Sequence, residues 1–163
     1  MPRKLIFSFL IALILLNPFQ PALALRTMDY SKQALIESDF SGQDLHGVTF
    51  NLTNLLKANL SNCDLSGASL FRAKLQEADL SNSNLSGATL DSAVLEGTNL
   101  ENAVLENAFA FDTRFINVSI TGADFTNVLM NDDVNKQLCT IADGTNRITG
   151  RDTRETLSCS SFS

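Results

Sequence analysis

The chain of 163 residues is long enough for one ordinary domain and too short for two. Its 18 Asp and Glu residues outnumber 12 Lys and Arg residues, which gives a formal net charge of −6 at pH 7. This acidic balance argues against binding to a nucleic-acid phosphate backbone, which requires a cationic surface.

The N-terminal segment has the three parts of a secretory signal peptide. Arg3 and Lys4 form a basic start, Leu5–Leu16 is an apolar run, and the triplet 22–24 offers small residues for cleavage. A helix of about 12 residues rises only about 18 Å, against a hydrocarbon core of about 30 Å. We expect residues 1–24 to be removed as a signal peptide, with an uncleaved membrane anchor as the alternative.

Cleavage after residue 24 leaves a more acidic chain. It removes two basic groups and no acidic one, so ten basic residues face eighteen acidic ones and the formal charge becomes −8. Such a charge suits solubility, a basic partner or mimicry of a polyanion. Twin-arginine export and lipoprotein anchoring are disfavoured, because the segment has no Arg-Arg pair and no Cys at the cleavage site. We expect an exported protein without a membrane span.

Residues 25–37 follow the cleavage site and precede a regular pattern. We assign them as an N-terminal lead-in or cap, because the first unit of a repeat array needs a cover. Within it, Ser31–Glu37 is expected to form a short helix or an irregular first turn that leads into Phe40.

A period of five residues dominates the rest of the chain. It suits neither an α-helix, where steps of five rotate by about 140°, nor a strand, where side chains alternate. Five residues must therefore form one structural unit that recurs. The apolar series is Leu35, Phe40, Leu45, Phe50, Leu55, Leu60, Leu65, Leu70, Leu75, Leu80, Leu85, Leu90, Leu95, Leu100, Leu105, Ala110, Phe115, Ile120, Phe125 and Met130.

The unit is Ala-(Asp/Asn)-Leu-x-x, as in Ala58–Asn62, Ala78–Asn82 and Ala123–Asn127. Over residues 38–132 this pattern resembles the pentapeptide-repeat family. The resemblance implies an all-β solenoid, a right-handed quadrilateral β-helix of nearly five coils with a short helical C-terminal cap. In that fold each unit makes one side, and the central residue and the small residue two positions earlier both point inward.

On such a lattice, residues twenty apart stack about 4.8 Å from each other. The larger Phe side chains fall in the first and last coils, where they would plug the ends. Four interior columns follow: Phe40, Leu60, Leu80, Leu100 and Ile120; Leu45, Leu65, Leu85, Leu105 and Phe125; Phe50, Leu70, Leu90, Ala110 and Met130; and Leu35, Leu55, Leu75, Leu95 and Phe115.

Ala110 is a defect in this lattice, because it places a methyl group where the column expects Leu. We expect a local bulge that turns the ring of Phe109 or Phe111 inward. If both rings stay outside, Phe71, Phe109, Phe111 and Leu129 share one outer face. They then form an apolar patch of the kind that another molecule usually covers.

Four carboxylates occupy the same slot on four successive sides and would ring one coil: Asp91, Glu96, Glu101 and Glu106. A solvated surface is one interpretation, and a docking belt for a basic partner is the other. Together with Phe71, Phe109 and Phe111, these residues are the candidate interaction surface.

No catalytic, cofactor or metal site is expected. The single His46 follows a central Leu at an outward position, and the acidic residues are spread over flat sides instead of meeting in a pocket. Asp44, Asp64 and Asp124 share an outer column, where we expect local side-chain to backbone hydrogen bonds more than cation binding.

After Met130 the period stops, and residues 133–163 are expected to form a cap. Asp132 or Asp133 can N-cap a helix that runs to about Ala142, with Gly144 placed to end it.

A second short helix is expected to start at Asp152, which has Glu155 three residues later, and to end near Cys159. Cys139 and Cys159 bracket the two helices, and in an exported chain we expect them to form a disulfide that stabilises by roughly 3 kcal/mol. A metal site is the weaker alternative. Cys63 falls at an inward small-residue position, where a buried free thiol is expected.

The tail is also similar to the C-terminal segment of lumenal pentapeptide-repeat proteins of cyanobacteria and chloroplasts, in its residues 138–139, 142–146, 149–150 and 153–159. With the signal peptide, this resemblance implies the thylakoid lumen or the periplasm.

The expected function is therefore that of a non-catalytic structural or interaction protein with an unidentified protein partner. The alternative comes from a cytoplasmic branch of the family, whose members imitate DNA and protect gyrase; the acidic surface fits it and the signal peptide does not. That branch dimerises through a C-terminal element, whereas this tail resembles a disulfide-tied cap, so we expect a monomer that binds no nucleic acid.

Overall fold

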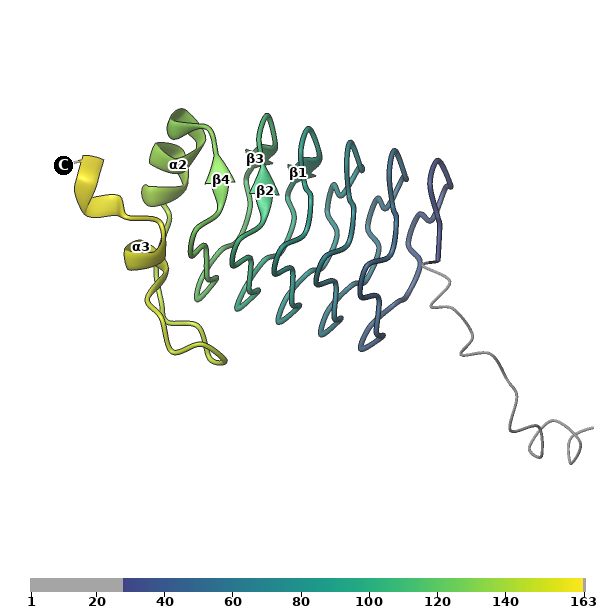
Figure 1. Ribbon diagram of the computed structural model, residues 1–163, viewed down its shortest axis with the longest axis horizontal. Coiled ribbons are helices and arrows are strands. Elements are labelled where there is room, and N and C mark those ends of the chain that lie inside the picture. Colours follow the sequence, from purple (N-terminus) through teal and green to yellow (C-terminus); the bar gives the residue numbers. More distant parts are fainter. Residues whose placement is uncertain (1–27, 163) are drawn as a thin grey trace, which may run out of the picture.

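The computed structural model describes residues 28–162, so the expected signal peptide lies outside the described residues. Figure 1 shows the chain winding through stacked coils that end in short helices. Parallel bridges join residues twenty apart in four columns. Below, a coil means the twenty residues between bridged partners, and a side means the segment that carries one column. The columns are 29–49–69–89–109–129, 34–54–74–94–114, 39–59–79–99–119 and 44–64–84–104–124.

The strands are short because a turn follows every few residues. β1 (Val94–Glu96) pairs in parallel with β3 (Arg114–Ile116). β2 (Phe109–Ala110) pairs in parallel with β4 (Leu129–Met130). The other sides contribute single bridges, so most inter-coil pairing comes from two or three backbone hydrogen bonds per side.

Each unit ends in a turn that requires a left-handed residue. Two positions after every central residue from Tyr30 to Phe125, the backbone φ is positive. In one such turn, Asn62 has a φ of 58° and the Cys63 N–H donates to the Leu60 carbonyl at 3.4 Å, as in a type II turn. Asn and Gly tolerate this conformation best, which explains why they recur at the fifth position of the unit.

The Asp or Asn before the central residue fixes the start of the turn. Its side-chain oxygen accepts the N–H two residues later, as Asp64 does from Ser66 at 3.0 Å and Asn59 from Ser61 at 3.1 Å. These are Asx turns, in which a side chain replaces a backbone acceptor. The preference for Asp and Asn in the unit is therefore a backbone requirement.

The central side chains fill the interior. Those from Phe40 to Phe125 are buried, and Leu35 and Met130 at the two ends are half-buried. Where Thr stands at the inward small-residue position, its hydroxyl donates to a central carbonyl of the preceding coil, as in Thr53 to Tyr30 and Thr98 to Leu75, both at 2.7 Å. The interior is therefore not wholly apolar, and its Thr hydroxyls are hydrogen-bonded.

The repeat begins earlier than the expected boundary at Ser38. Asp29 and Ala34 already bridge to the next coil, so residues 31–37 form two regular turns and not a helix. Among the described residues, Tyr30 is the first central residue, and its ring stacks on Phe50 at 5.2 Å and meets Phe40 edge-on at 5.8 Å. Tyr30 is missing from the apolar series because of its hydroxyl group, yet its ring packs against two central Phe rings.

The expected bulge at Ala110 is absent. Ala110 is buried and pairs in register with Met130, while Phe109 and Phe111 are 41% and 45% exposed. The carbonyls of both Phe residues accept N–H groups from the preceding coil. The Leu90 N–H donates to Phe109 at 2.7 Å, and the Ser92 N–H donates to Phe111 at 2.9 Å. A bulge would break this ladder, so the prediction of an inward ring is wrong and both rings stay outside.

The first helix of the cap differs from expectation at both ends. α2 (Asp132–Cys139) has Asn131 as its N-cap, while Asp132 and Asp133 lie in its first turn, where carboxylates favour the helix dipole. It stops three residues before Ala142, and Thr140 is its C-cap.

The second part of the cap starts where the sequence indicated. Asp152 accepts the N–H groups of Arg154 and Glu155 and caps α3 (Thr153–Thr156), which is followed by the 3₁₀ helix η1 (Cys159–Phe162). The Cys139–Cys159 disulfide is formed and ties α2 to η1, and Cys63 is a buried free thiol. Within residues 28–162 no helix combines the length and apolar character needed to cross a bilayer.

Candidate interaction surface

One side of the rod carries most of the exposed large apolar side chains. It consists of the stacked sides 49–52, 69–72, 89–92, 109–112 and 129–132, and we call it the apolar face. Among the described residues, the other three sides expose one large apolar side chain, that of Ile36. The apolar face exposes five, each between 38% and 49%: Leu52, Phe71, Phe109, Phe111 and Leu129.

The lattice itself arranges these residues. Phe71, Asp91 and Phe111 hold equivalent positions in successive coils, directly after the central residue, so they form a row up the rod. Phe109 and Leu129 are a bridged pair just before the central residue. The sequence could identify this face only on the condition that both Phe rings stay outside.

Charge on the apolar face is segregated along the rod. The Arg72 guanidinium lies over the Phe71 ring, 5.4 Å from its centroid, in the half nearer the N-terminus. Asp112 lies in the half nearer the cap, and Asp91 lies on the middle side of the five. Asp91 accepts the Phe111 N–H at 2.8 Å, and the Asp112 N–H donates to Asn131, so the backbone fixes where both residues lie.

The acidic ring is not a single surface. Asp91, Glu96, Glu101 and Glu106 lie on four different sides of one coil, so a flat partner would meet only one or two of them. Three of the four also bind within the chain: Asp91 to the Phe111 N–H, Glu101 to the Ser119 hydroxyl at 2.7 Å, and Glu106 to Arg151 at 3.0 Å. The docking belt therefore stays a prediction, and the structure does not bring its members together.

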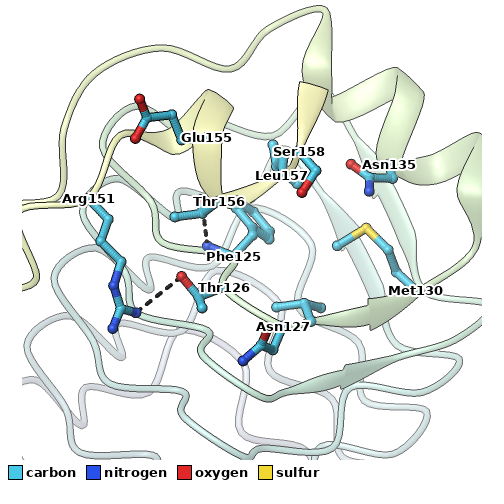
Figure 2. A pocket seen from close by; sticks show the side chains of 11 residues that line it. Phe125, Thr126, Asn127, Met130, Asn135, Arg151, Glu155, Thr156, Leu157 and Ser158 are labelled. Carbon is cyan, nitrogen blue, oxygen red and sulfur yellow. Dashed lines mark hydrogen bonds between the residues drawn. The ribbon is translucent and has the colours of Figure 1, made fainter. Parts of the chain in front are cut away.

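A groove of about 490 Å³ lies between the last coil and the cap (Figure 2). Phe125 and Leu157 are buried at its base, and the Thr156 hydroxyl accepts the Phe125 N–H at 3.1 Å. Its lining contains one carboxylate, Glu155, and neither His nor Cys. The groove thus lies where the cap contacts the last coil. It lacks the converging acid, base and nucleophile of a catalytic site.

One side of the last coil is locked to the cap by a charge network. Asp124 is completely buried, and Arg151 donates to its carboxylate at 3.1 Å while pairing with Glu106 at 3.0 Å. Burial acts to raise the pKa of Asp124, but hydrogen bonds from Thr126 and Thr149 and the charge of Arg151 outweigh it and hold the pKa below its usual range. The carboxylate therefore acts as a structural anchor.

The remaining polar candidates serve the lattice. His46 is exposed and its Nδ1 lies 2.9 Å from the Ser66 hydroxyl. Asp44, Asp64 and Asp124 each accept an N–H two residues later, so their column is built from Asx turns. The described part of the chain gathers no group of three or more His, Cys, Asp or Glu side chains that could hold a metal ion.

Comparison with known proteins agrees with this geometry. The family model for pentapeptide repeats matches residues 35–70 and 68–107, with eight copies. The thylakoid lumenal 15 kDa protein 1 of Arabidopsis thaliana chloroplasts is 52% identical over 48 residues, which are 29% of this chain. The match spans only 21% of that relative's length.

A solved structure gives the wider match. It is the crystal structure of a pentapeptide repeat protein from the Arabidopsis thaliana thylakoid lumen, which is 46% identical to this chain with a TM-score of 0.77. The alignment covers 78% of this chain and 88% of that one. On the matched repeats and on this relative, the chain belongs to the pentapeptide-repeat family.

Proposed function

We propose that this is a non-catalytic protein of the thylakoid lumen whose regular outer sides bind another protein. The observation that carries the location is the 46% identity, over most of both chains, to a protein of that compartment. The N-terminal segment, with its basic start and short apolar run, supports export and cleavage near residue 24.

The polar side chains of the repeat already bind backbone groups, which supports a non-catalytic role. The Asp and Asn residues of the repeat accept backbone N–H groups, as Asp64 and Asp124 do. The groove beside the cap holds one carboxylate and a bound guanidinium. Acid-base catalysis needs convergent groups with perturbed environments, and a lattice of local turns uses its carboxylates differently.

We infer a right-handed quadrilateral β-helix of nearly five coils, closed at the far end by the disulfide-tied cap. Support comes from the twenty-residue register, the turn between successive sides, and the fold shared by relatives of the family. Flat, stacked sides of this kind offer regular surfaces for protein contact.

Fractionation of the source cells tests the compartment. The mature protein is expected in the lumenal fraction with Leu25 as its first residue, which N-terminal sequencing would establish. A cytosolic or stromal chain that begins at Met1 would overturn the proposal and would favour the DNA-mimicking branch of the family.

Capture experiments test the role in binding. Immobilised mature protein is expected to retain a specific protein from the lumenal fraction, and a Phe71→Ser variant on the apolar face is expected to retain less. Ile36→Ser changes a somewhat more exposed apolar residue on another side, 47% against 38% for Phe71, and is the matched control. If the parent and both variants retain the same amount of the captured protein, the apolar face is not the binding surface.

A further inference from the structure

We propose that the apolar face is the interface of a reversible dimer, in which two copies of this chain pack face to face with their long axes antiparallel. This inference rests on the proposed function, in which outer sides bind protein, and it names the partner as a second copy. It departs from the monomer expected from the sequence, because the self-complementarity is visible only on the lattice.

Symmetry decides which residues would meet. When two flat faces pack through a twofold axis, that axis lies in the plane of contact. An axis running across the rod keeps each residue's place on the side and reverses the order of the coils. With the axis at side 89–92, side 69–72 of one copy covers side 109–112 of the other.

This single operation pairs residues of matching chemistry twice. Phe71 and Phe111 hold the same position on their sides, so each Phe71 faces Phe111 of the second copy. Arg72 and Asp112 also share a position, so each Arg72 faces Asp112 of the second copy. One position of the twofold axis therefore gives both the aromatic contact and the pairing of opposite charges.

Parallel packing does not give this match. With the axis along the rod, each coil side would face the same side of the second copy. That axis also reverses each residue's place across the side, so Arg72 would lie level with Arg72 of the second copy but at the opposite edge, and neither Arg72 nor Asp112 would face an opposite charge. Charge segregation along the apolar face therefore selects the antiparallel arrangement.

The area suits a weak dimer. A large apolar side chain has roughly 150–250 Å² of surface, so five that are about two-fifths exposed present on the order of 400 Å² per copy. Two copies with their polar rims then bury about 1,000 Å², near the lower limit for specific complexes. We expect a dissociation constant of roughly 10–100 μM.

The operation also places Leu52 opposite Asp132, an unfavourable pair, and a second opposing contact provides a sharp test. Asp91 lies on the coil at the axis and would face Asp91 of the second copy. Its carboxylate already accepts the Phe111 N–H, so it cannot turn away freely. Asp91→Asn keeps an oxygen for that bond and removes the like-charge repulsion, so it is expected to tighten the dimer about threefold to tenfold.

Sedimentation equilibrium of the mature protein, at loading concentrations up to roughly 500 μM and low salt, measures the association. Phe71→Ser is expected to weaken it about tenfold, and Ile36→Ser to leave it unchanged. Arg72→Asp alone and Asp112→Arg alone each place like charges opposite one another and are expected to weaken it by a similar factor. The double variant restores opposite charges and is expected to return to within about threefold of the parent.

A parent protein that stays monomeric over this range overturns the inference, as does a double variant no better than either single one. Circular dichroism of every variant separates lost association from lost folding. If the parent is monomeric but still captures a lumenal protein, the dimer fails and the proposed function stands. If it dimerises but lies outside the lumen and captures nothing, the proposed function fails and the dimer stands.

Discussion

In the body of the rod, residues 28–130, a residue's place in its five-residue unit decides its environment. In the cap, residues 131–162, each contact is made once. The body repeats the same turn and the same ladder of backbone bonds on every side. The cap depends on one disulfide, on the ion pair between half-exposed Arg151 and buried Asp124, and on Asn146, whose side chain donates to the carbonyls of Asn102, Ala103 and Gly122.

This difference predicts two kinds of failure. Because each coil contacts only its neighbours, damage to one unit of the body weakens the coils on both sides of it. Damage to the cap leaves those contacts intact and exposes the edge of the last coil. The predictions below test this contrast, from the largest effect to the smallest.

The largest effect is expected from a cavity in the middle of the body. Leu85 is completely buried, and Leu85→Ala should lower the free energy of unfolding by about 2–5 kcal/mol. Urea unfolding followed by circular dichroism measures the change. Leu129→Ala removes a half-exposed Leu from the outer surface and should cost much less, and equal losses at the two sites would contradict the assigned interior.

Removal of the disulfide should have the next largest effect. Cys139→Ser with Cys159→Ser is expected to cost about 3 kcal/mol, because the closed loop of 20 residues restricts the unfolded chain. Unlike the Leu85 change, it should open the cap before the body. Proteolysis that cuts the double variant first within residues 131–162 agrees with this, whereas first cuts within the coils would contradict it. Cys63→Ser leaves the disulfide intact and is the control.

Asp124 should make the junction of body and cap sensitive to acid. The folded-state pKa of Asp124 lies below the usual 3.8, so its stabilising effect is complete above that value and is lost as pH falls through the folded pKa. Asp124→Asn should cost about 2 kcal/mol near pH 7. The difference between parent and variant should shrink below about pH 4. A difference that stays constant down to pH 3 would contradict the anchor role.

The smallest effect concerns the left-handed turn residue. Asn62 has a φ of 58°, so Asn62→Ala should cost about 1 kcal/mol, while Asn62→Gly should cost less because Gly adopts this φ without strain. Thermal unfolding of both variants measures the ranking. If Ala proves as stable as Gly, backbone strain does not explain the fifth position of the unit.

Sequence alone predicted the body well because the same turn and the same inward positions recur every five residues. The inward place of residues such as Leu65 and Ala68 follows from the spacing and the family resemblance, and both are buried. The demand for Asn or Gly at the end of the unit was also present in the sequence, in Asn62 and Gly67. The turn geometry explains this preference, whereas the apolar period by itself indicates only the central position.

The two ends were less predictable because they follow no period. Tyr30 stacks on Phe50 in the first described coil although its hydroxyl excludes it from an apolar series. At the cap, Asn131 precedes α2 where Asp132 or Asp133 was expected, since any of three neighbouring residues has the right chemistry. Ala110 kept its register because ladder hydrogen bonds on both sides outweighed a fuller interior, a balance that composition does not reveal.

Amide hydrogen exchange measured residue by residue tests the lattice most directly. The Asn107 N–H donates to the Thr126 carbonyl of the next coil at 2.9 Å, and the Leu60 and Asn62 N–H groups donate in the same way. The Ser61 N–H instead meets only the side chain of its own turn. We predict slow exchange at the first three and faster exchange at Ser61, repeating every five residues through the body. Protection without that five-residue period would contradict the account.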